Sequence, residues 1–585
     1  MRIFFLLLVV LVAGDGRAEP DTFGLGTGRD GYLRLDSGSR IVNRYARLIA
    51  DAPSGSSVLT VSDSTGFAAG DLVLVHQSTG LAAPDSGNQT PLDLGSGQVG
   101  RIEYARVASV SPGVIRLTAP LLYGRAGNLS QVVRVPEYTD LEVRSGASLR
   151  AAPWDGSVGG ILAVMATGRL RNDGLISVDG AGFRGGAFLS HANLNGCTGL
   201  DEPVASGGAY KGEGLAAGRF GTASGRGNLA NGGGGGICHN SGGGGGGHAG
   251  LGGQGGRSAP ADGEQDVGGM GGAPLVYRPY EHLVFGGGGG AGEGNNDGGT
   301  GGGAGGGLML LRATEVRGLG RFSAAGATPP PTPGGDGAGG GGAGGAISIR
   351  TREEIECGAV EAPGGAGGDN SETSFPLAPG GGGAGGVVFL QGEVFACSRS
   401  VLAGAPGRMA TDGGTHGAGP DSVNAGPALG SAQALSRPFG MPSAPVLTLP
   451  ADGAQQEGPG LHVEGQAAAG GQRVLLLLDG VLLARLETGA DGRFAFDVPE
   501  ALPMGHHELR AVTEELGVHS LSSTPVGFTA VPQGNGGGPP GEVPPGEVSP
   551  LVLSVGFGCG SAPGAGLGAG AVLLAVVAAR RRRKP

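Results

Sequence analysis

The sequence has few aromatic residues, few lysines and no long helical pattern. Aromatic residues make up 4% of the 585 residues, with a single tryptophan, so much of the chain cannot pack as an ordinary globular core. The net charge of -11 argues against nucleic acid as a partner and against a basic surface for anionic lipid. Outside the two ends no window keeps an apolar period of 3.6 residues, which predicts a mainly β protein with few helices.

Nucleotide-binding and serine-hydrolase motifs are also missing. Gly-x-Gly-x-x-Gly matches are frequent, but no helical pattern follows them and no Gly-Lys-Ser or Gly-Lys-Thr exists. No nucleophile elbow stands out in the serine-poor core. The sequence therefore offers no catalytic residue and no cofactor-binding residue.

Cysteine is rare, with five in the chain. Cys559 belongs to the C-terminal tail, and the other four are Cys197, Cys238, Cys357 and Cys397. An even number in an oxidising compartment predicts two disulfides, for which three pairings exist.

Residues 1–18 have the pattern of a secretory signal peptide. Arg2 precedes an almost unbroken apolar run from 3 to 13, and small residues lead to a predicted cleavage between Ala18 and Glu19. No cysteine lies near this point, so an N-terminal lipid anchor is not indicated. The chain is therefore expected to be exported.

The last 28 residues, 558–585, combine a cysteine, an apolar stretch and a basic cluster. Cys559 precedes the stretch 565–579, and a basic block follows it, formed by Arg580, Arg581, Arg582, Arg583 and Lys584. The stretch predicts a short hydrophobic helix, but it is shorter than the roughly 20 residues of a comfortable span. We interpret it as a handling signal whose basic end stays cytoplasmic; a plain single-span anchor with an incidental cysteine is the alternative.

This tail resembles the C-terminal sorting signal of myxobacterial surface proteins (MYXO-CTERM type), in which a Gly-Cys pair precedes a membrane segment and an arginine cluster. The resemblance implies processing near Cys559 by a sorting machinery. It also implies attachment to the cell surface at the outer membrane, with membrane contact through the tail only.

Two β regions follow the signal peptide. From 19 to 158, alternating apolar runs between Gly, Pro, Asp and Ser turns predict an N-terminal β-domain, with strands at 58–61, 72–75, 114–117 and 132–135. From 159 to 440, a glycine precedes each of the apolar runs 161–165, 308–311, 346–349 and 387–390. Each run leads to a second short strand ending in glycine, at 175–180, 321–326, 359–364 and 401–404. This pattern describes the coils of a glycine-rich parallel β-helix.

The same repeat bears on the cysteines. Cys357 lies eleven residues after Ala346 and Cys397 ten after Val387, so both fall at nearly the same point of successive coils. Strands of adjacent coils lie about 4.8 Å apart, which suits the Cα separation of a disulfide. The repeat favours Cys357 with Cys397, and elimination leaves Cys197 with Cys238.

The longest glycine runs are 232–236, 242–247, 286–290 and 339–345, and they lack the strict three-residue period of collagen. Flexible disorder is one interpretation. The other is order, with glycine forming tight corners or packed extended strands. The regular spacing favours order.

The C-terminal third contains a separate unit and a linker. Residues 441–530 hold seven short strand patterns and an Asp479-Gly480 hairpin turn, which predict a β-sandwich. This unit resembles a bacterial immunoglobulin-like domain. The Pro/Gly-rich residues 531–557 predict an extended stalk.

A β-helix can also carry a polysaccharide lyase or a glycoside hydrolase. Acidic residues of the repeat region do not recur at one coil position, as such a site would need. Glu293 and Asp297 could hold Ca²⁺, although a solvated turn is the preferred interpretation. His191, His239 and His248 join Cys197 and Cys238 in a set of zinc-ligand types, but their spacing fits no zinc motif.

Segments 66–77, 132–143 and 182–186, together with Trp154-Asp-Gly, look like a module of glycine-rich bacterial surface proteins. With the tail, the chain is similar to myxobacterial adventurous gliding motility proteins of the AgmC type. That resemblance implies a role in gliding or adhesion and carries no catalytic residues. The leading hypothesis is a non-enzymatic surface protein, structural or adhesive, with surface polysaccharide or other surface proteins as partners. The alternative is a surface-anchored lyase or hydrolase.

Overall fold

The structure is a computed structural model that describes residues 21–192, 197–259, 267–416, 418, 432–458, 460–499 and 501–532. The predicted cleavage point at Ala18 and Glu19, most of the stalk, Cys559 and the basic cluster at Arg580, Arg581, Arg582 and Arg583 lie outside the described residues. Within them, the only helix is the 3-10 turn Val204–Ser206, and the mainly β prediction is confirmed. None of the described helices is long and apolar enough to cross a membrane.

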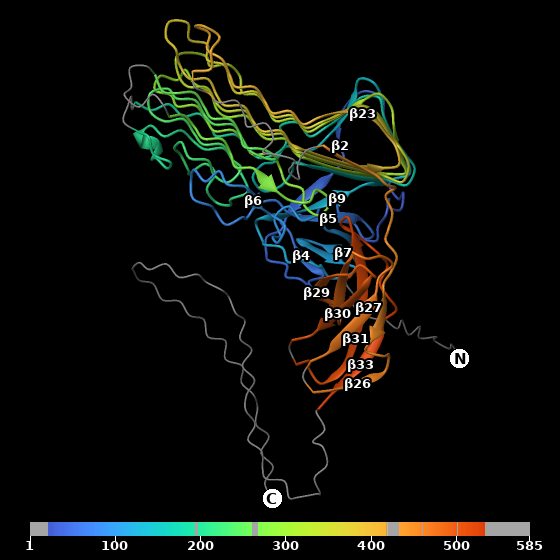
Figure 1. The fold of residues 1–585 in the computed structure, drawn as a ribbon. Coiled ribbons are helices and arrows are strands. Elements are labelled where there is room, and N and C mark those ends of the chain that lie inside the picture. Colours follow the sequence, from blue (N-terminus) through green and yellow to red (C-terminus); the bar gives the residue numbers. More distant parts are fainter. Residues whose placement is uncertain are drawn as a thin grey trace, which may run out of the picture. The chain divides into compact units, whose positions relative to one another are not determined.

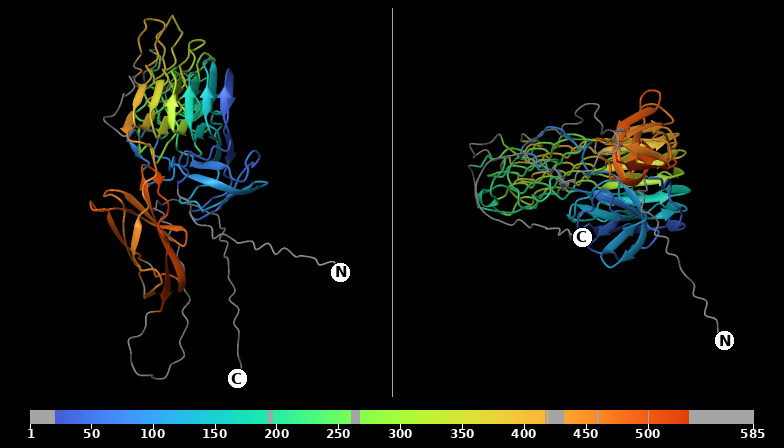
Figure 2. Two further views of the ribbon diagram at one scale, coloured as in Figure 1. Left: turned by 90° about the vertical axis from the view of Figure 1, so that its right-hand side faces the viewer. Right: turned by 90° about the horizontal axis from the view of Figure 1, so that it is seen from below.

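Successive coils of the chain place their strands side by side in a parallel sheet (Figure 2). Its strands are β10 (Glu137–Tyr138), β13 (Ile161–Ala166), β17 (Leu308–Ala313), β20 (Ala346–Thr351), β22 (Val387–Gly392) and β24 (Gln433–Ser436). One register row joins Ile161, Leu308, Ala346 and Val387. These are the residues that follow glycine in the predicted repeat, so the register is confirmed.

A second parallel sheet closes the other side of the coils. One half contains β1 (Leu33–Leu35), β11 (Leu141–Val143), β14 (Arg169–Asn172) and β18 (Glu315–Arg317). The other half contains β2 (Gly38–Ile41), β12 (Ala147–Arg150), β15 (Leu175–Ser177) and β19 (Arg321–Ser323). The halves meet at β21 (Ile355–Glu361), which also pairs with β23 (Phe395–Ser400).

Three of the four predicted second strands are confirmed as β15, β19 and the end of β21. The fourth, at 401–404, is wrong. The strand there is β23, because pairing with β21 ends at Ser400, and residues beyond it bond to glycine segments instead, as Gly404 does to Gly383. The stack of coils that these two parallel sheets form already begins at β1 and β2. Both strands lie inside the range 19–158 that the sequence assigned to an N-terminal domain.

The space between the two parallel sheets is filled by aliphatic side chains from alternate strand positions. Leu162, Met309, Ile347 and Val388 come from one sheet, and Ile176, Phe322 and Val360 from the other, all fully buried. Since one coil cannot enclose these side chains, neighbouring coils bury them jointly. These buried side chains form a continuous column, which is the core of the stacked coils.

The N-terminal antiparallel sheet covers the other face of the first parallel sheet. Its order is β3 (Arg44–Arg47), β9 (Ser130–Val135), β5 (Leu72–Gln77), β7 (Tyr104–Ser111), β8 (Val114–Leu117) and β4 (Val58–Thr60). A bridge between Leu48 and Val61 brings its two edges together. Leu72 and Val133 pack in one cluster with Ile161 and Leu308. The four strands predicted in this region are confirmed.

The long glycine runs are ordered and pack side by side, away from the sheets (Figure 1). Along the run 242–247, successive backbone N–H groups donate hydrogen bonds to three neighbouring segments in turn. Gly242 and Gly245 donate to Gly256 and Gly253, Gly243 and Gly246 to Ala338 and Gly341, and Gly244 and Gly247 to Gly234 and Asn231. A period of three is that of an extended helix of the polyproline II type, which has no internal hydrogen bonds.

A second run has the same pattern. Gly286, Gly289 and Gly292 donate to Gly306, Gly303 and Thr300, while Gly287 and Gly290 donate to Gly247 and Gly244. No glycine of either run has a positive φ, so they are packed extended segments rather than corners or disordered chain. A Cβ on Gly245 would overlap the carbonyl of Gly382, and one on Gly290 that of Gly234. We call these segments the glycine bundle.

The C-terminal unit is a sandwich of two sheets. One contains β25 (Val446–Leu449), β27 (His462–Gln466) and β30 (Arg493–Asp497). The other contains β26 (Ala454–Glu457), β33 (Val526–Val531), β31 (Gly505–Glu515), β28 (Arg473–Leu478) and β29 (Val481–Glu487), with β32 (Val518–His519) paired to β31. The seven predicted strands are present, and Asp479 and Gly480 form the β28–β29 turn with φ of 51° and 81°.

Candidate binding surfaces

The four cysteines of the described chain form the two disulfides favoured by the sequence. Cys357 and Cys397 link adjacent coils with a Cα separation of 4.8 Å. Cys197 and Cys238 are joined with a Cα separation of 5.4 Å, and Cys238 is fully buried. These pairs exclude the cysteines as zinc ligands. They brace two regions, the stack and the loops beside the glycine bundle.

Two of the three histidines considered as zinc ligands have different neighbours: His191 lies beside Glu293, and His248 lies beside Tyr277 and Gly344. His248 is fully buried, with Nε2 2.6 Å from the Tyr277 hydroxyl and Nδ1 2.5 Å from the Gly344 carbonyl. Burial lowers the pKa of His248 to about 4, so the ring is neutral at pH 7. Within the described ranges no group of three or more His, Cys, Asp and Glu side chains could hold a metal ion.

The two calcium candidates, Glu293 and Asp297, belong to different environments. Glu293 is fully buried, accepts the N–H of Asn240 and lies 3.1 Å from Nδ1 of His191. Asp297 is exposed and its N–H donates to Ser190 at 3.1 Å. The loop between them is closed by Asp336, which accepts the N–H of Gly298 at 2.7 Å. The solvated-turn interpretation is therefore wrong for Glu293, whose buried carboxylate contacts Asn240 and His191.

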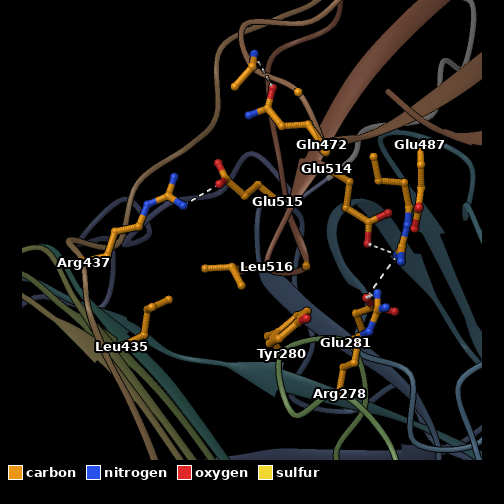
Figure 3. Close-up of a pocket in the computed structure, with 15 residues that line it drawn as sticks. Arg278, Tyr280, Glu281, Leu435, Arg437, Gln472, Glu487, Glu514, Glu515 and Leu516 are labelled. Carbon is orange, nitrogen blue, oxygen red and sulfur yellow. Dashed lines mark hydrogen bonds and ion pairs between the residues drawn. The ribbon is translucent and has the colours of Figure 1, made fainter. Parts of the chain in front are cut away.

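A cleft of about 480 Å³ lies where the C-terminal sandwich meets the loop containing Arg278 and Glu281 (Figure 3). Arg473 bridges Glu281 at 3.1 Å and Glu514 at 3.3 Å, and Arg437 pairs with Glu515. Because these charges satisfy one another across the junction, we interpret the cleft as a joint rather than as a binding site.

Apolar contacts support the same joint. Leu122 and Tyr123 of the N-terminal region pack with Leu475, Leu477 and Val512 of the sandwich. Gly517 approaches the carbonyl of Tyr280 so closely, with a φ of 68°, that a side chain would not fit. The sandwich is thus held by a packed interface and not by charge alone.

A wider groove of about 910 Å³ lies beside the first coil. It is lined by Tyr32, Tyr45 and Tyr138, and by Arg40, Arg44 and other residues around β2 and β3. Tyr32 is 57% exposed, whereas Tyr138 is buried. The Tyr45 hydroxyl donates to the Ile161 carbonyl at 2.7 Å, which fixes that ring at the groove wall.

Five charged residues line the groove, of which Arg40, Arg44 and Asp63 form no ion pair with a described residue. Arg40 and Arg44 are exposed and form no ion pair with any residue that the structure describes, whereas Arg134 nearby pairs with Asp30 and Asp71. Burial raises the pKa of Tyr138 to about 12, so its hydroxyl stays a neutral donor. Aromatic rings beside unpaired guanidinium groups suit a ligand with flat apolar faces and negative groups.

The outer face of the second parallel sheet carries paired charges. Glu142 on β11 lies 2.9 Å from Arg144, and Arg169 on β14 lies 2.6 Å from Glu315 on β18. Arg317 reaches Glu356 of the next coil at 3.0 Å. Exposed pairs of this kind contribute little to stability, typically 0 to about 1 kcal/mol.

Sequence reasoning missed the groove. Its tyrosines and arginines stand about 90 residues apart in two clusters, 32–45 and 134–138, and only the pairing of β2 with β12 and of β3 with β9 brings them together. The one available signal was the concentration of Tyr and Arg in residues 29–47 of a chain poor in aromatics.

No family model matches this chain, and no curated protein matches it. Among solved structures, the fibronectin(III)-like modules of CbhA from Clostridium thermocellum are 19% identical over 15% of this chain and 98% of that one, with a TM-score of 0.13. The gp54 tailspike of Acinetobacter baumannii bacteriophage AP22, solved with a capsular saccharide, is 10% identical over 77% of this chain and 80% of its own, with a TM-score of 0.14. The gp61 tailspike of Pseudomonas phage phi297 is 11% identical over 82% and 84%, with a TM-score of 0.13. At these TM-scores the likenesses carry no argument.

Proposed function

We propose that the chain is an exported, non-enzymatic cell-surface protein with an adhesive or structural role, and that its groove beside the first coil binds acidic surface polysaccharide. The observation that carries the proposal is that Arg40 and Arg44, which form no ion pair with a described residue, share one groove with three tyrosines. Sugar rings pack their C–H faces on aromatic rings, and guanidinium groups bind carboxylates in a bidentate manner.

The scaffold behind the groove supports this role. Its coils combine a buried aliphatic column with a glycine bundle whose backbone groups are bonded to neighbouring segments. Both features restrict movement, so a ligand bound at the first coil meets a preorganised surface. The charged outer face of the second sheet offers further area for contact with other surface proteins.

The proposal includes the attachment of the chain. The tail would be processed near Cys559 and hold the body at the outer membrane, with an immunoglobulin-like sandwich and a stalk as spacers, in a protein of gliding motility or cell cohesion. Replacing Cys559 with serine should then leave an unprocessed species in the inner membrane. Unchanged mass and surface display of Cys559→Ser would reject this part.

Binding can be tested with the purified processed chain and polygalacturonate, alginate and neutral dextran. We expect salt-sensitive binding to the acidic polymers only, weakened at least tenfold in the double variant Arg40→Gln/Arg44→Gln. Arg116→Gln is the matched control, because Arg116 is exposed, has no ion pair among the described residues and lies outside the groove. Equal binding by the double variant would contradict the groove. Release of reducing ends or unsaturated sugars would favour the lyase or hydrolase alternative.

A further inference from the structure

A small cavity adjoins the joint cleft and shares Tyr280 and Gly517 with it. Its wall includes Tyr104 from the N-terminal sheet and Arg312, Ser348 and Arg350 from the first parallel sheet. The centre of a water-sized particle has about 10 Å³ in which to move, which is room for one such particle.

Arg350 brings a positive charge into this cavity without a counter-charge. Arg350 is 5% exposed, and its Nε donates to Oε1 of Gln391 at 2.8 Å. Its two terminal nitrogens donate to no residue in the described part of the chain. The guanidinium lies 4.8 Å from the ring centre of Phe439 and 5.8 Å from that of Phe389, and burial lowers the pKa of Arg350 to about 9.

The neighbouring charges do not neutralise Arg350. Arg312 faces Phe439 as well, and both of its terminal nitrogens are taken by Asp21, at 3.0 and 2.5 Å. His519 of the sandwich accepts the N–H of Asp21 at Nδ1, so that nitrogen carries no proton, and burial lowers the pKa of His519. Two guanidinium groups therefore share one carboxylate, which leaves a net charge of about one positive unit in a desolvated site.

Two neutral donors face the same space. Ser348 is 5% exposed and Tyr104 is 4% exposed, and neither hydroxyl is hydrogen-bonded to a described residue. Burial raises the pKa of Tyr104 to about 12, so its hydroxyl keeps its proton. A buried guanidinium and two hydroxyl groups line this space, and all three can donate a hydrogen bond into it.

We infer that this cavity binds one small monovalent anion of the size of chloride, held by the terminal nitrogens of Arg350 with the hydroxyls of Ser348 and Tyr104. The anion would complete the charge balance of the Asp21, Arg312 and Arg350 cluster. Because Gly517 closes the cavity and Val518 packs with Leu25 and Phe439, the bound anion also strengthens the attachment of the sandwich. This site is independent of the saccharide groove.

The inference can be tested on the processed chain by thermal unfolding at constant ionic strength and pH 7, with sodium chloride replacing sodium gluconate. We expect the midpoint to rise with chloride and to saturate, since a ligand that binds only the folded state stabilises it by mass action. Bromide should act in the same way. Chloride-35 NMR should show line broadening that disappears on unfolding.

Arg350→Met tests the assignment to this cavity, and it should abolish both the midpoint shift and the line broadening. Arg399→Met is the matched control, because Arg399 is exposed on β23 and forms no ion pair in the described ranges. If Arg350→Met does not fold, Ser348→Ala should weaken the chloride affinity several-fold. Equal midpoints in chloride and gluconate would overturn the inference, with water alone in the cavity. Chloride dependence that survives in Arg350→Met would overturn it as well.

Discussion

The parallel sheets and the glycine bundle are parts of the same coils, yet they are held together by opposite means. Between the sheets, side chains such as Ile347 and Ile349 fill the space. In the bundle, glycine backbones pack directly against neighbouring backbone, and each N–H group of the run 242–247 bonds to one of three neighbouring segments. One region is specified by branched side chains, and the other by the absence of a Cβ.

This difference predicts opposite responses to substitution. Loss of a methyl group between the sheets leaves a cavity, to which the surrounding side chains can partly adjust. Addition of a methyl group in the bundle pushes backbone against backbone, and neither side has a rotamer to change.

Gly245→Ala should have the largest effect. Its Cβ would overlap the carbonyl of Gly382, so we expect a loss of about 5 kcal/mol or more in the free energy of unfolding, or no folded protein. Gly440→Ala is the control, because nothing lies within 4 Å of its added Cβ and its φ is not positive. Urea unfolding of both variants measures the difference, and a Gly245→Ala variant as stable as Gly440→Ala would disprove backbone packing in the bundle.

Ile349→Ala should be the next largest. The side chain is fully buried between the sheets, so truncation should cost about 2–5 kcal/mol in the free energy of unfolding. Ile349→Val should cost only about 1 kcal/mol. A graded series of this kind is expected for the column, and abrupt loss of folding in Ile349→Val would contradict the contrast with the bundle.

The two disulfides give a matched pair. They span 41 and 40 residues, so the chain-entropy model assigns both the same contribution, about 4 kcal/mol at most. We expect Cys197→Ser/Cys238→Ser to cost more than Cys357→Ser/Cys397→Ser, because Cys238 is buried while Cys397 is half-exposed and its coils are already paired by β21 and β23. Denaturant unfolding of the two double variants shows which one loses more stability. A larger loss in Cys357→Ser/Cys397→Ser would show that the stack of coils depends more on its disulfide than the loops beside the bundle do.

Acid should destabilise the folded protein by protonating its buried histidines. Burial lowers the pKa of His76 and of His248 to about 4 from the ordinary 6.5. Between those values the unfolded chain binds more protons than the folded one, so stability falls as the pH drops from 6.5 to 4 and is constant above 6.5. Each ring accounts for at most about 3 kcal/mol of this loss in the free energy of unfolding.

His248→Gln should flatten this pH profile by removing the titrating ring from the bundle. The free energy of unfolding at pH 7.5 and at pH 5 gives the comparison with the unaltered chain. The same difference between the two pH values in both proteins would show that His248 is not held neutral.

The sequence predicts much of the stack and the sandwich because their strands carry their own signals. A glycine followed by an apolar run predicts that Ile161, Leu308, Ala346 and Val387 occupy equivalent positions in successive coils. These four residues pair with one another in the observed register. The coil period also brings Cys357 to Cys397.

The bundle, the groove and the anion cavity could not be predicted in the same way. Glycine has no side chain to distinguish one neighbour from another, so the partners of Gly245 are fixed only by the fold. β1 and β2 are too short, at three and four residues, to show a pattern. Arg350 looks like any polar residue at a strand end, and its burial depends on Phe439 and the sandwich.

Native-state hydrogen exchange tests the order of the glycine bundle most directly. We expect the amides of 242–247 and 286–292 to be protected to a degree similar to those of β17 and β20, because their N–H groups are bonded to neighbouring segments. Exchange of these glycines at the rate of an unstructured peptide, while β17 and β20 stay protected, would contradict the bundle and with it the stiff scaffold behind the proposed surface role.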